Sequence, residues 1–194
     1  MSLDRNPHNV IPGAVAGTIN ALSAATNEPG IKRFVVTSSS TAAHLLRPSS
    51  LGPPNPVHRT VTVDTWNDEM VTAAYQDPPY ELDQGSIVYA ASKTLAEKAA
   101  WDFVRERRPA FTLNTVLPDH NFGAGLDPDN QGYPSTLGLV ADLFRGNPGL
   151  LSILPSRKCI LYSPGIVIIP KIYTDHSFMT KTTSSMWKIQ RYCM

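Results

Sequence analysis

The sequence has few of the features that mark secreted, membrane-spanning or nucleic-acid-binding proteins. Its two cysteines, Cys159 and Cys193, are too few for a disulfide framework, so a reducing, cytoplasmic compartment is expected. No apolar run reaches the roughly 18 residues of a membrane span, and the polar N-terminus is unlike a signal peptide. A net charge of +1 indicates neither nucleic acid nor an anionic membrane as a partner.

Residues that build metal centres and hydrolytic triads are scattered or missing. The five histidines are dispersed along the chain, and the cysteines lie far from each other. A zinc site needs clustered His and Cys ligands, so we expect no bound metal. The Gly-x-Ser-x-Gly elbow of many Ser-His-Asp hydrolases is also absent, which argues against that class of enzyme.

What the chain does contain fits one globular domain with a distinct end segment. It has 194 residues, 42% of them hydrophobic and 17% charged. Residues 1–156 contain 11 Lys and Arg against 15 Asp and Glu, whereas residues 157–194 contain 6 against 1. Both cysteines also lie in the second segment. We therefore expect a domain over 1–156 and a divergent, poorly ordered tail over 157–194.

The first periodic stretch predicts a helix over residues 13–22. Its apolar side chains recur on one helical face, and the Asn-Glu-Pro-Gly sequence at 27–30 ends it. Gly13 and Gly17 are interpreted as letting this helix approach a sheet closely. A phosphate-binding glycine loop is the alternative, but no strand precedes these glycines.

Two β-prone runs on either side of a helix predict βαβ units. Residues 34–40 and 111–117 are expected to be buried strands of a parallel sheet, with a helix over 86–107 between them. The proline-rich residues 44–85 are expected to be irregular, and residues 136–145 to form a short helix. The first strand runs into three serines at the edge where ligands bind in such sheets, although these hydroxyls could simply cap a turn.

The helix over 86–107 carries the most reactive pair of side chains. Tyr89, Lys93 and Glu97 are four residues apart and are predicted to share one polar face. A neighbouring ammonium favours the phenolate form of a tyrosine, which could then exchange a proton with a substrate oxygen near neutral pH. The alternative is that Tyr89 and Lys93 only decorate a surface helix. The predicted apolar face comprises Val88, Ala91, Leu95, Ala99 and Phe103.

Several blocks together resemble the short-chain dehydrogenase/reductase superfamily, most closely its extended, NAD-dependent epimerase/dehydratase-like branch. Ser39, Tyr89 and Lys93 follow the order of that family's catalytic Ser and Tyr-x-x-x-Lys. Phe-Val-Val-Thr-Ser-Ser at 34–39 is similar to the strand before the catalytic Ser. Asp-Thr-Trp-Asn at 64–67 resembles a loop of fungal aldehyde and ketone reductases and of dihydroflavonol and cinnamoyl-CoA reductases. These motifs cover about residues 5–156.

The resemblance implies an α/β fold with part of a Rossmann-like, doubly wound parallel sheet. It also implies hydride transfer between NADP(H) and the carbonyl or alcohol group of a small molecule, as in aldehyde and ketone reductases. Tyr89 would be the general acid or base, and Ser39 would hydrogen-bond the carbonyl oxygen, with Ser38 as the competing assignment. Lys93 would lower the pKa of Tyr89 and hold the nicotinamide ribose.

The resemblance assigns two further sets of residues around this centre. Trp66 could wall the substrate pocket or simply anchor its loop, and His120 could touch substrate or be an ordinary loop histidine. The cofactor contacts it implies are Thr37, Ser38, Tyr89, Lys93, Leu117 and Pro118. The substrate contacts it implies are Ser40, Trp66, His120 and Asn121.

The sequence departs from the family at both ends. The family opens with a strand, a Gly-x-x-Gly-x-x-Gly turn and a helix that hold the pyrophosphate, and no such unit is present here. We therefore interpret the sequence as a truncated or mispredicted product, and we expect weak dinucleotide binding and an unpaired strand edge at 34–39. A non-catalytic reductase fragment is the alternative function. The sequence decides neither the substrate, nor the oligomeric state, nor NADP against NAD.

Overall fold

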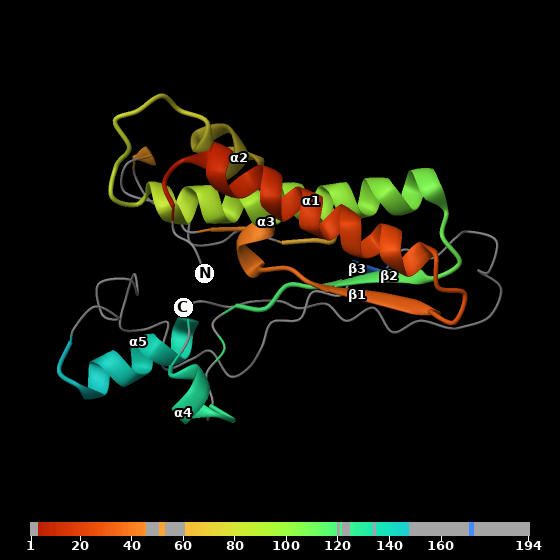
Figure 1. Cartoon of the computed structure of the whole chain (residues 1–194). Coiled ribbons are helices and arrows are strands. Elements are labelled where there is room, and N and C mark those ends of the chain that lie inside the picture. The colour runs from red at the N-terminus through yellow and green to blue at the C-terminus, as the bar shows by residue number, and fades with distance from the viewer. Residues whose placement is uncertain are drawn as a thin grey trace.

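A computed structural model describes residues 4–45, 51–52, 61–119, 121, 125–133, 135–147 and 171–172. The two longest helices lie side by side over one face of a small sheet (Figure 1). The elements in order are α1 (Pro7–Thr26), β1 (Arg33–Thr37), the 3-10 turn η1 (Ser40–Ala42), α2 (Asp68–Ala74), α3 (Gln84–Arg107), β2 (Thr112–Val116), α4 (Pro128–Gln131), α5 (Ser135–Phe144) and β3 (Lys171–Ile172). None of the described helices has both the length and the hydropathy needed to cross a bilayer.

Helix α1 begins earlier than its apolar pattern predicts. The side chain of Asn6 caps it by accepting a hydrogen bond from His8 N–H, and Pro7 occupies the first turn, where its missing N–H costs nothing. The helix then continues through Pro12, which the prediction placed before its start. Ahead of the cap, hydrogen bonds from Asn6 N–H and the Asn9 amide hold the pKa of Asp4 below its ordinary value.

The sheet confirms the two predicted strands and their parallel pairing. β1 pairs with β2 from Arg33 opposite Thr112 to Thr37 opposite Val116, and β3 adds to β2 in the antiparallel direction. The order is β1-β2-β3, so β1 is an edge strand in the part of the chain that the structure describes.

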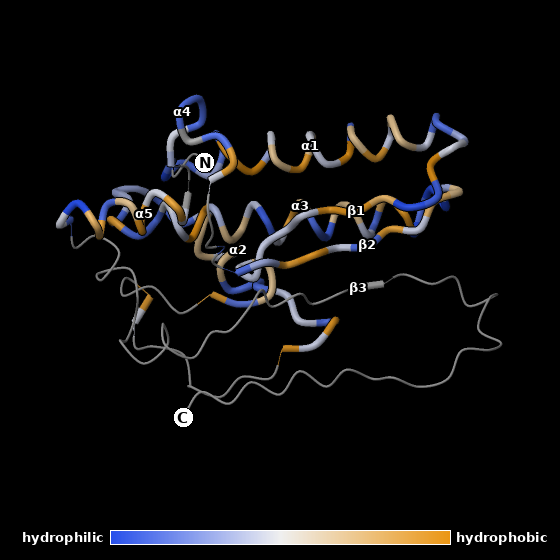
Figure 2. The backbone as a smooth tube through the Cα atoms, turned by 90° about the horizontal axis from the view of Figure 1, so that it is seen from below, coloured by the Kyte–Doolittle hydropathy of each residue, from blue (hydrophilic) through white to orange (hydrophobic). Residues whose placement is uncertain are grey.

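Two apolar clusters hold the helices against the sheet and against each other. One joins Leu22 of α1 and Val104 of α3 with Leu113 of β2, and Phe34 of β1 packs on it. The other lies at the opposite end of α3, where Ile87 packs with residues of α1 and α2. Figure 2 shows the apolar stretches of β1 and β2 running beside each other. Burial of these side chains is the main stabilising contribution to the two-layer arrangement.

The prediction that the first strand is buried is wrong for one of its faces. Phe34 and Val36 are half-buried toward the helices, but Val35 is 54% exposed and Arg33 and Thr37 are exposed as well. The prediction assumed a central strand covered on both faces. In the described residues, α1 and α3 cover one face only (Figure 1).

Within the stretch that was expected to be irregular, residues 68–74 form helix α2. Met70, Ala73 and Ala74 are spaced by three and four residues, and all three are buried in the cluster shared with α3. That spacing was the available signal, but seven residues are too few for a pattern search to separate from chance. The predicted helices at 86–107 and 136–145 are confirmed as α3 and α5.

The interpretation of Gly13 and Gly17 as points of close approach is also wrong. A Cβ atom built on either glycine would meet no atom within 4 Å. Instead, both glycines line an open groove of about 360 Å³ between α1 and the side chains of Phe34 and Val36. The helix therefore does not approach β1 closely at this point, and the missing side chains leave space.

This space predicts that Gly17→Ala stabilises the protein. Alanine removes backbone freedom from the unfolded chain and meets no obstacle in the folded one, so the free energy of unfolding should rise by about 0.5–1 kcal/mol. Chemical denaturation measures the change. The neighbouring exposed change Ala16→Gly is the matched control and should lower stability by a similar amount. A loss of stability in Gly17→Ala would show that another surface occupies the groove.

Candidate active site

The carboxyl ends of β1 and β2 meet, as the sequence predicts. Ser38 N–H donates to the Val116 carbonyl at 2.8 Å, and Ser40 N–H donates to the Pro118 carbonyl at 2.9 Å. Backbone pairing thus continues beyond both strands and brings the three serines beside Leu117 and Pro118. Leu117 is fully buried, so the loop that follows β2 leaves the sheet from a fixed point.

The structure brings together the phenol and the ammonium of the predicted catalytic pair. Tyr89 and Lys93 are half-buried and lie one turn apart on α3. The Lys93 ammonium is 5.7 Å from the centre of the Tyr89 ring. At this separation the positive charge interacts favourably with the ring face and with negative charge that develops on the phenol.

Glu97 was predicted to share this polar face, and the structure places it elsewhere. It is 1% exposed, and it accepts hydrogen bonds from the hydroxyls of Ser38 at 2.6 Å and Thr115 at 3.0 Å. Glu97 follows Tyr89 by eight residues, which corresponds to two turns of an α-helix plus about 80° of rotation. This rotation directs Glu97 toward the strands. Of the predicted apolar face, Val88 and Ala91 are buried, whereas Leu95, Ala99 and Phe103 are only half-buried.

The same contacts distinguish the two candidate serines. The Ser38 hydroxyl donates its proton to Glu97. Ser39 is 8% exposed and caps η1, where its oxygen accepts from Thr41 N–H at 3.3 Å and from the Thr41 hydroxyl at 3.0 Å. Neither of these bonds uses the Ser39 proton, because a hydroxyl oxygen accepts two hydrogen bonds and donates one. Ser39 is therefore better suited to donate to a substrate oxygen.

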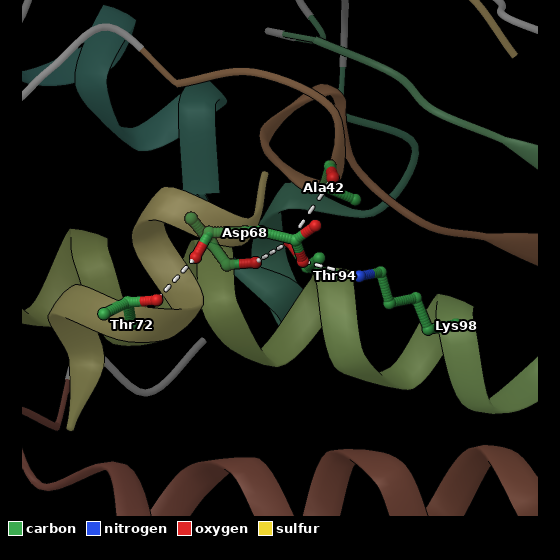
Figure 3. Close-up of polar contacts among 6 residues, drawn as sticks. Ala42, Asp68, Thr72, Thr94 and Lys98 are labelled. Atoms are coloured by element: carbon green, nitrogen blue, oxygen red, sulfur yellow. Dashed lines mark hydrogen bonds and ion pairs between the residues drawn. The ribbon is translucent and has the colours of Figure 1, made fainter. Parts of the chain in front are cut away.

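Two residues that were not predicted as site residues contact the turn after Ser39, Thr94 from α3 and Asn67 from the position before α2. The Thr94 hydroxyl donates to the Ala90 carbonyl of its own helix at 2.8 Å. It also contacts the Ala42 carbonyl at 3.3 Å, as Figure 3 shows. Asn67 N–H donates to the same carbonyl at 3.0 Å, and the Asn67 amide donates to the Thr41 carbonyl at 2.9 Å. The turn is thus in contact with α3 at Thr94, the residue after Lys93, and is hydrogen-bonded to Asn67 before α2. Asn67 stands inside the recognised 64–67 loop, which was a signal for it.

Trp66 lies beside a later part of α3. The Lys98 ammonium is 5.4 Å from a Trp66 ring centre and forms an ion pair with Asp68 (Figure 3). Lys98 follows Tyr89 by nine residues, which is about 13 Å along a helix axis. This contact is the one that the loop-anchoring alternative predicts, and the substrate role of Trp66 stays a prediction.

The remaining predicted substrate contacts lie after β2. The Ser40 hydroxyl donates to Asp119 at 3.2 Å, and the exposed Asn121 donates to the Asp119 carbonyl at 3.2 Å. The Thr136 hydroxyl donates to the Asn121 carbonyl, so the loop is linked to α5. His120 lies outside the described residues.

No family model matches the chain. Aldehyde reductase 2 of Sporidiobolus salmonicolor is 36% identical over 192 residues, covering 94% of this chain and 53% of that protein. The NAD-dependent epimerase/dehydratase terH of Aspergillus terreus is 38% identical over 145 residues, covering 75% of this chain and 40% of that protein. An anthocyanidin reductase of Vitis vinifera is 32% identical over 182 residues, covering 93% of this chain and 48% of that protein.

The chain spans about half the length of these relatives, or less. A match over 94% of the chain extends past residue 156, beyond the range that the recognised motifs cover. Among solved structures, the yeast methylglyoxal/isovaleraldehyde reductase Gre2, complexed with NADPH, superposes with a TM-score of 0.52 at 27% identity. The match covers 70% of this chain and 38% of that chain. The fold is thus part of a Rossmann-like α/β fold, as predicted.

The anchoring of the Ser39 turn predicts that Asn67→Ala destabilises the protein. Asn67 is 2% exposed, and its loss leaves the Thr41 carbonyl without this donor, at a cost of about 1–3 kcal/mol. Denaturant unfolding measures the effect. Asn20→Ala, at an exposed position of α1, is the control and should change stability by no more than about 0.5 kcal/mol. Equal effects of the two changes would contradict the anchoring role.

Proposed function

Because the chain belongs to the extended short-chain dehydrogenase/reductase superfamily, we propose that its site transfers a hydride between NADP(H) and a carbonyl/alcohol pair. The observation that carries this proposal is the pairing of Tyr89 with Lys93 on a helix to which the Ser39 turn is fixed. The substrate class is an aldehyde or ketone, in line with the names of the relatives.

The residues present fit the nicotinamide end of such a cofactor. Lys93 offers a cationic donor suited to ribose hydroxyls, and the backbone at Leu117 and Pro118 lies at the same edge of the sheet as the serines. Thr37 and Ser38 stand at the end of β1 beside them. NADPH, when bound, supplies the hydride. In the residues given, no Gly-x-x-Gly-x-x-Gly motif offers a site for its pyrophosphate.

Each catalytic side chain has one task in the proposed reduction. Tyr89 donates its phenolic proton to the carbonyl oxygen as the hydride reaches the carbonyl carbon, and it takes that proton back in the oxidation. Ser39 donates a hydrogen bond to the same oxygen and stabilises the negative charge that develops there. Lys93 stabilises the charge left on the phenol oxygen when the proton has moved.

A second candidate function is a reductase fragment without catalytic activity. The exposed edge strand β1 favours it, because Val35 is 54% exposed on the face that the described helices do not cover. A sheet that is covered on one face only could still carry the catalytic side chains but fail to bind the cofactor. Cofactor binding therefore separates the two candidates.

The proposal predicts that Tyr89→Phe abolishes NADPH-dependent reduction. Removing a general acid lowers kcat by about 10²–10⁴-fold. The assay follows loss of NADPH absorbance with methylglyoxal or isovaleraldehyde, the two substrates in the name of the yeast relative. Tyr75→Phe, at an exposed tyrosine, is the control and should retain full activity. Undiminished activity in Tyr89→Phe would refute the assignment.

Cofactor binding should depend on Lys93. We expect NADPH to raise the melting temperature of the wild-type protein slightly, and Lys93→Ala to remove most of this shift, because the ribose loses its cationic donor. Lys32→Ala is the control, because this exposed lysine lies just before the amino end of β1, whereas the site lies at the carboxyl end. If the wild-type protein shows no NADPH-dependent shift at any concentration tested, the non-catalytic candidate is preferred.

A further inference from the structure

We propose that Glu97 is a positioning residue that holds the ends of both strands against α3. Its buried carboxyl group fixes the segment carrying Ser39 relative to the helix carrying Tyr89 and Lys93. The catalytic consequence rests on the function proposed above. The structural clamp itself follows from the contacts of Glu97 alone, and it can be tested without an activity.

One side chain joins three elements here. Ser38 directly follows β1, Thr115 belongs to β2, and Glu97 projects from α3. The two carboxyl oxygens are used separately, Oε2 by the Ser38 hydroxyl at 2.6 Å and Oε1 by the Thr115 hydroxyl at 3.0 Å. These contacts bridge 59 and 18 residues of sequence, so each closes a tertiary connection. The position of both strand ends is therefore tied to a single point on the helix.

Burying a carboxyl group at this position has a high free-energy cost. Removing it from water costs several kcal/mol unless hydrogen bonds compensate, and an apolar side chain would fill the space without that cost. Apolar side chains do occupy other buried positions of the same helix, such as Ala100 and Val104, while the nearest buried position before Glu97 is Thr94. The carboxyl group makes the contact directional. Its two hydrogen bonds fix the distance and angle between the helix and the strand ends, whereas apolar packing would allow them to shift relative to each other.

The clamp lies where it affects the proposed reaction. Ser38 and Ser39 are consecutive, so fixing the first sets the backbone position of the second to within one peptide unit of about 3.8 Å. Glu97 is four residues past Lys93 on the same helix. Together with Thr94, which contacts the Ala42 carbonyl, it fixes both sides of the Ser39 turn to α3. A shift of about 1 Å between catalytic groups costs up to 10²-fold in rate.

The structural part is tested by amide hydrogen exchange in Glu97→Ala. Ser38 N–H and Ser40 N–H bond across the strand ends, so their exchange should accelerate about tenfold or more, while the amides of α1 keep wild-type rates. Glu97→Gln retains a carbonyl acceptor and an amide donor, and should give a smaller acceleration. Glu106→Ala, at an exposed glutamate of the same helix, is the control and should change none of these amides.

The catalytic part is tested by kinetics with NADPH and isovaleraldehyde. Glu97→Ala should lower kcat about tenfold or more with the KM for NADPH changed less than about twofold, and Glu97→Gln should recover part of the loss. Ser38→Ala, which keeps the carboxyl group, should lower kcat in the wild-type background but not in a Ser39→Ala background, since it acts through Ser39. Additive losses would overturn the positioning role.

The outcomes separate this inference from the proposed function. An inactive wild-type protein would refute the proposed function, and the exchange experiment would still decide the clamp. An active wild-type protein whose strand-end amides and kcat are unaltered in Glu97→Ala would overturn the inference alone. If Glu97→Ala does not fold, Glu97→Gln and Ser38→Ala give the same decision.

Discussion

The site depends on the contact between α3 and the ends of the two parallel strands. The helix presents different side chains on successive turns: Tyr89 and Lys93 stay half-buried, and Glu97 turns in to meet the strands. Thr94 contacts the last residue of the 3-10 turn η1, which begins at Ser40. Because one rigid helix supplies all four side chains, their mutual spacing is fixed by helix geometry. Only the strand ends remain to be held, and hydrogen bonds hold them.

The elements with long repeating patterns could be predicted from the sequence, and those that depend on surroundings could not. Helix α3 and the parallel pair β1 and β2 follow from periodicity and from apolar runs. The exposure of Val35 does not follow, because the run Phe-Val-Val is the same whether one face of the strand is covered or both. The interpretation of Gly13 and Gly17 is wrong for a similar reason, because glycine is compatible both with a close contact between elements and with an empty groove.

The candidate site shows the same division at the level of single side chains. The family resemblance locates Tyr89, Lys93 and the serines, since these residue types recur in a fixed order. It favours Ser39 over Ser38 only by position in the motif, because the two are chemically identical neighbours. The separation comes from which hydroxyl has already donated its proton, and that is set by Glu97, 59 residues away from Ser38. A contact between residues so far apart in sequence cannot be read from local patterns in a single sequence.

Several hydrogen bonds converge on the strand end that carries the site. In a central parallel strand, neighbours on both sides and layers on both faces hold the strand end. In the described residues β1 has one neighbour and one covered face. Its end is instead held by backbone bonds from Ser38 and Ser40, by the Glu97 carboxyl group and, beyond η1, by Asn67. Such directional bonds keep the Ser39 turn in register with α3 where apolar packing on one face would allow it to slide.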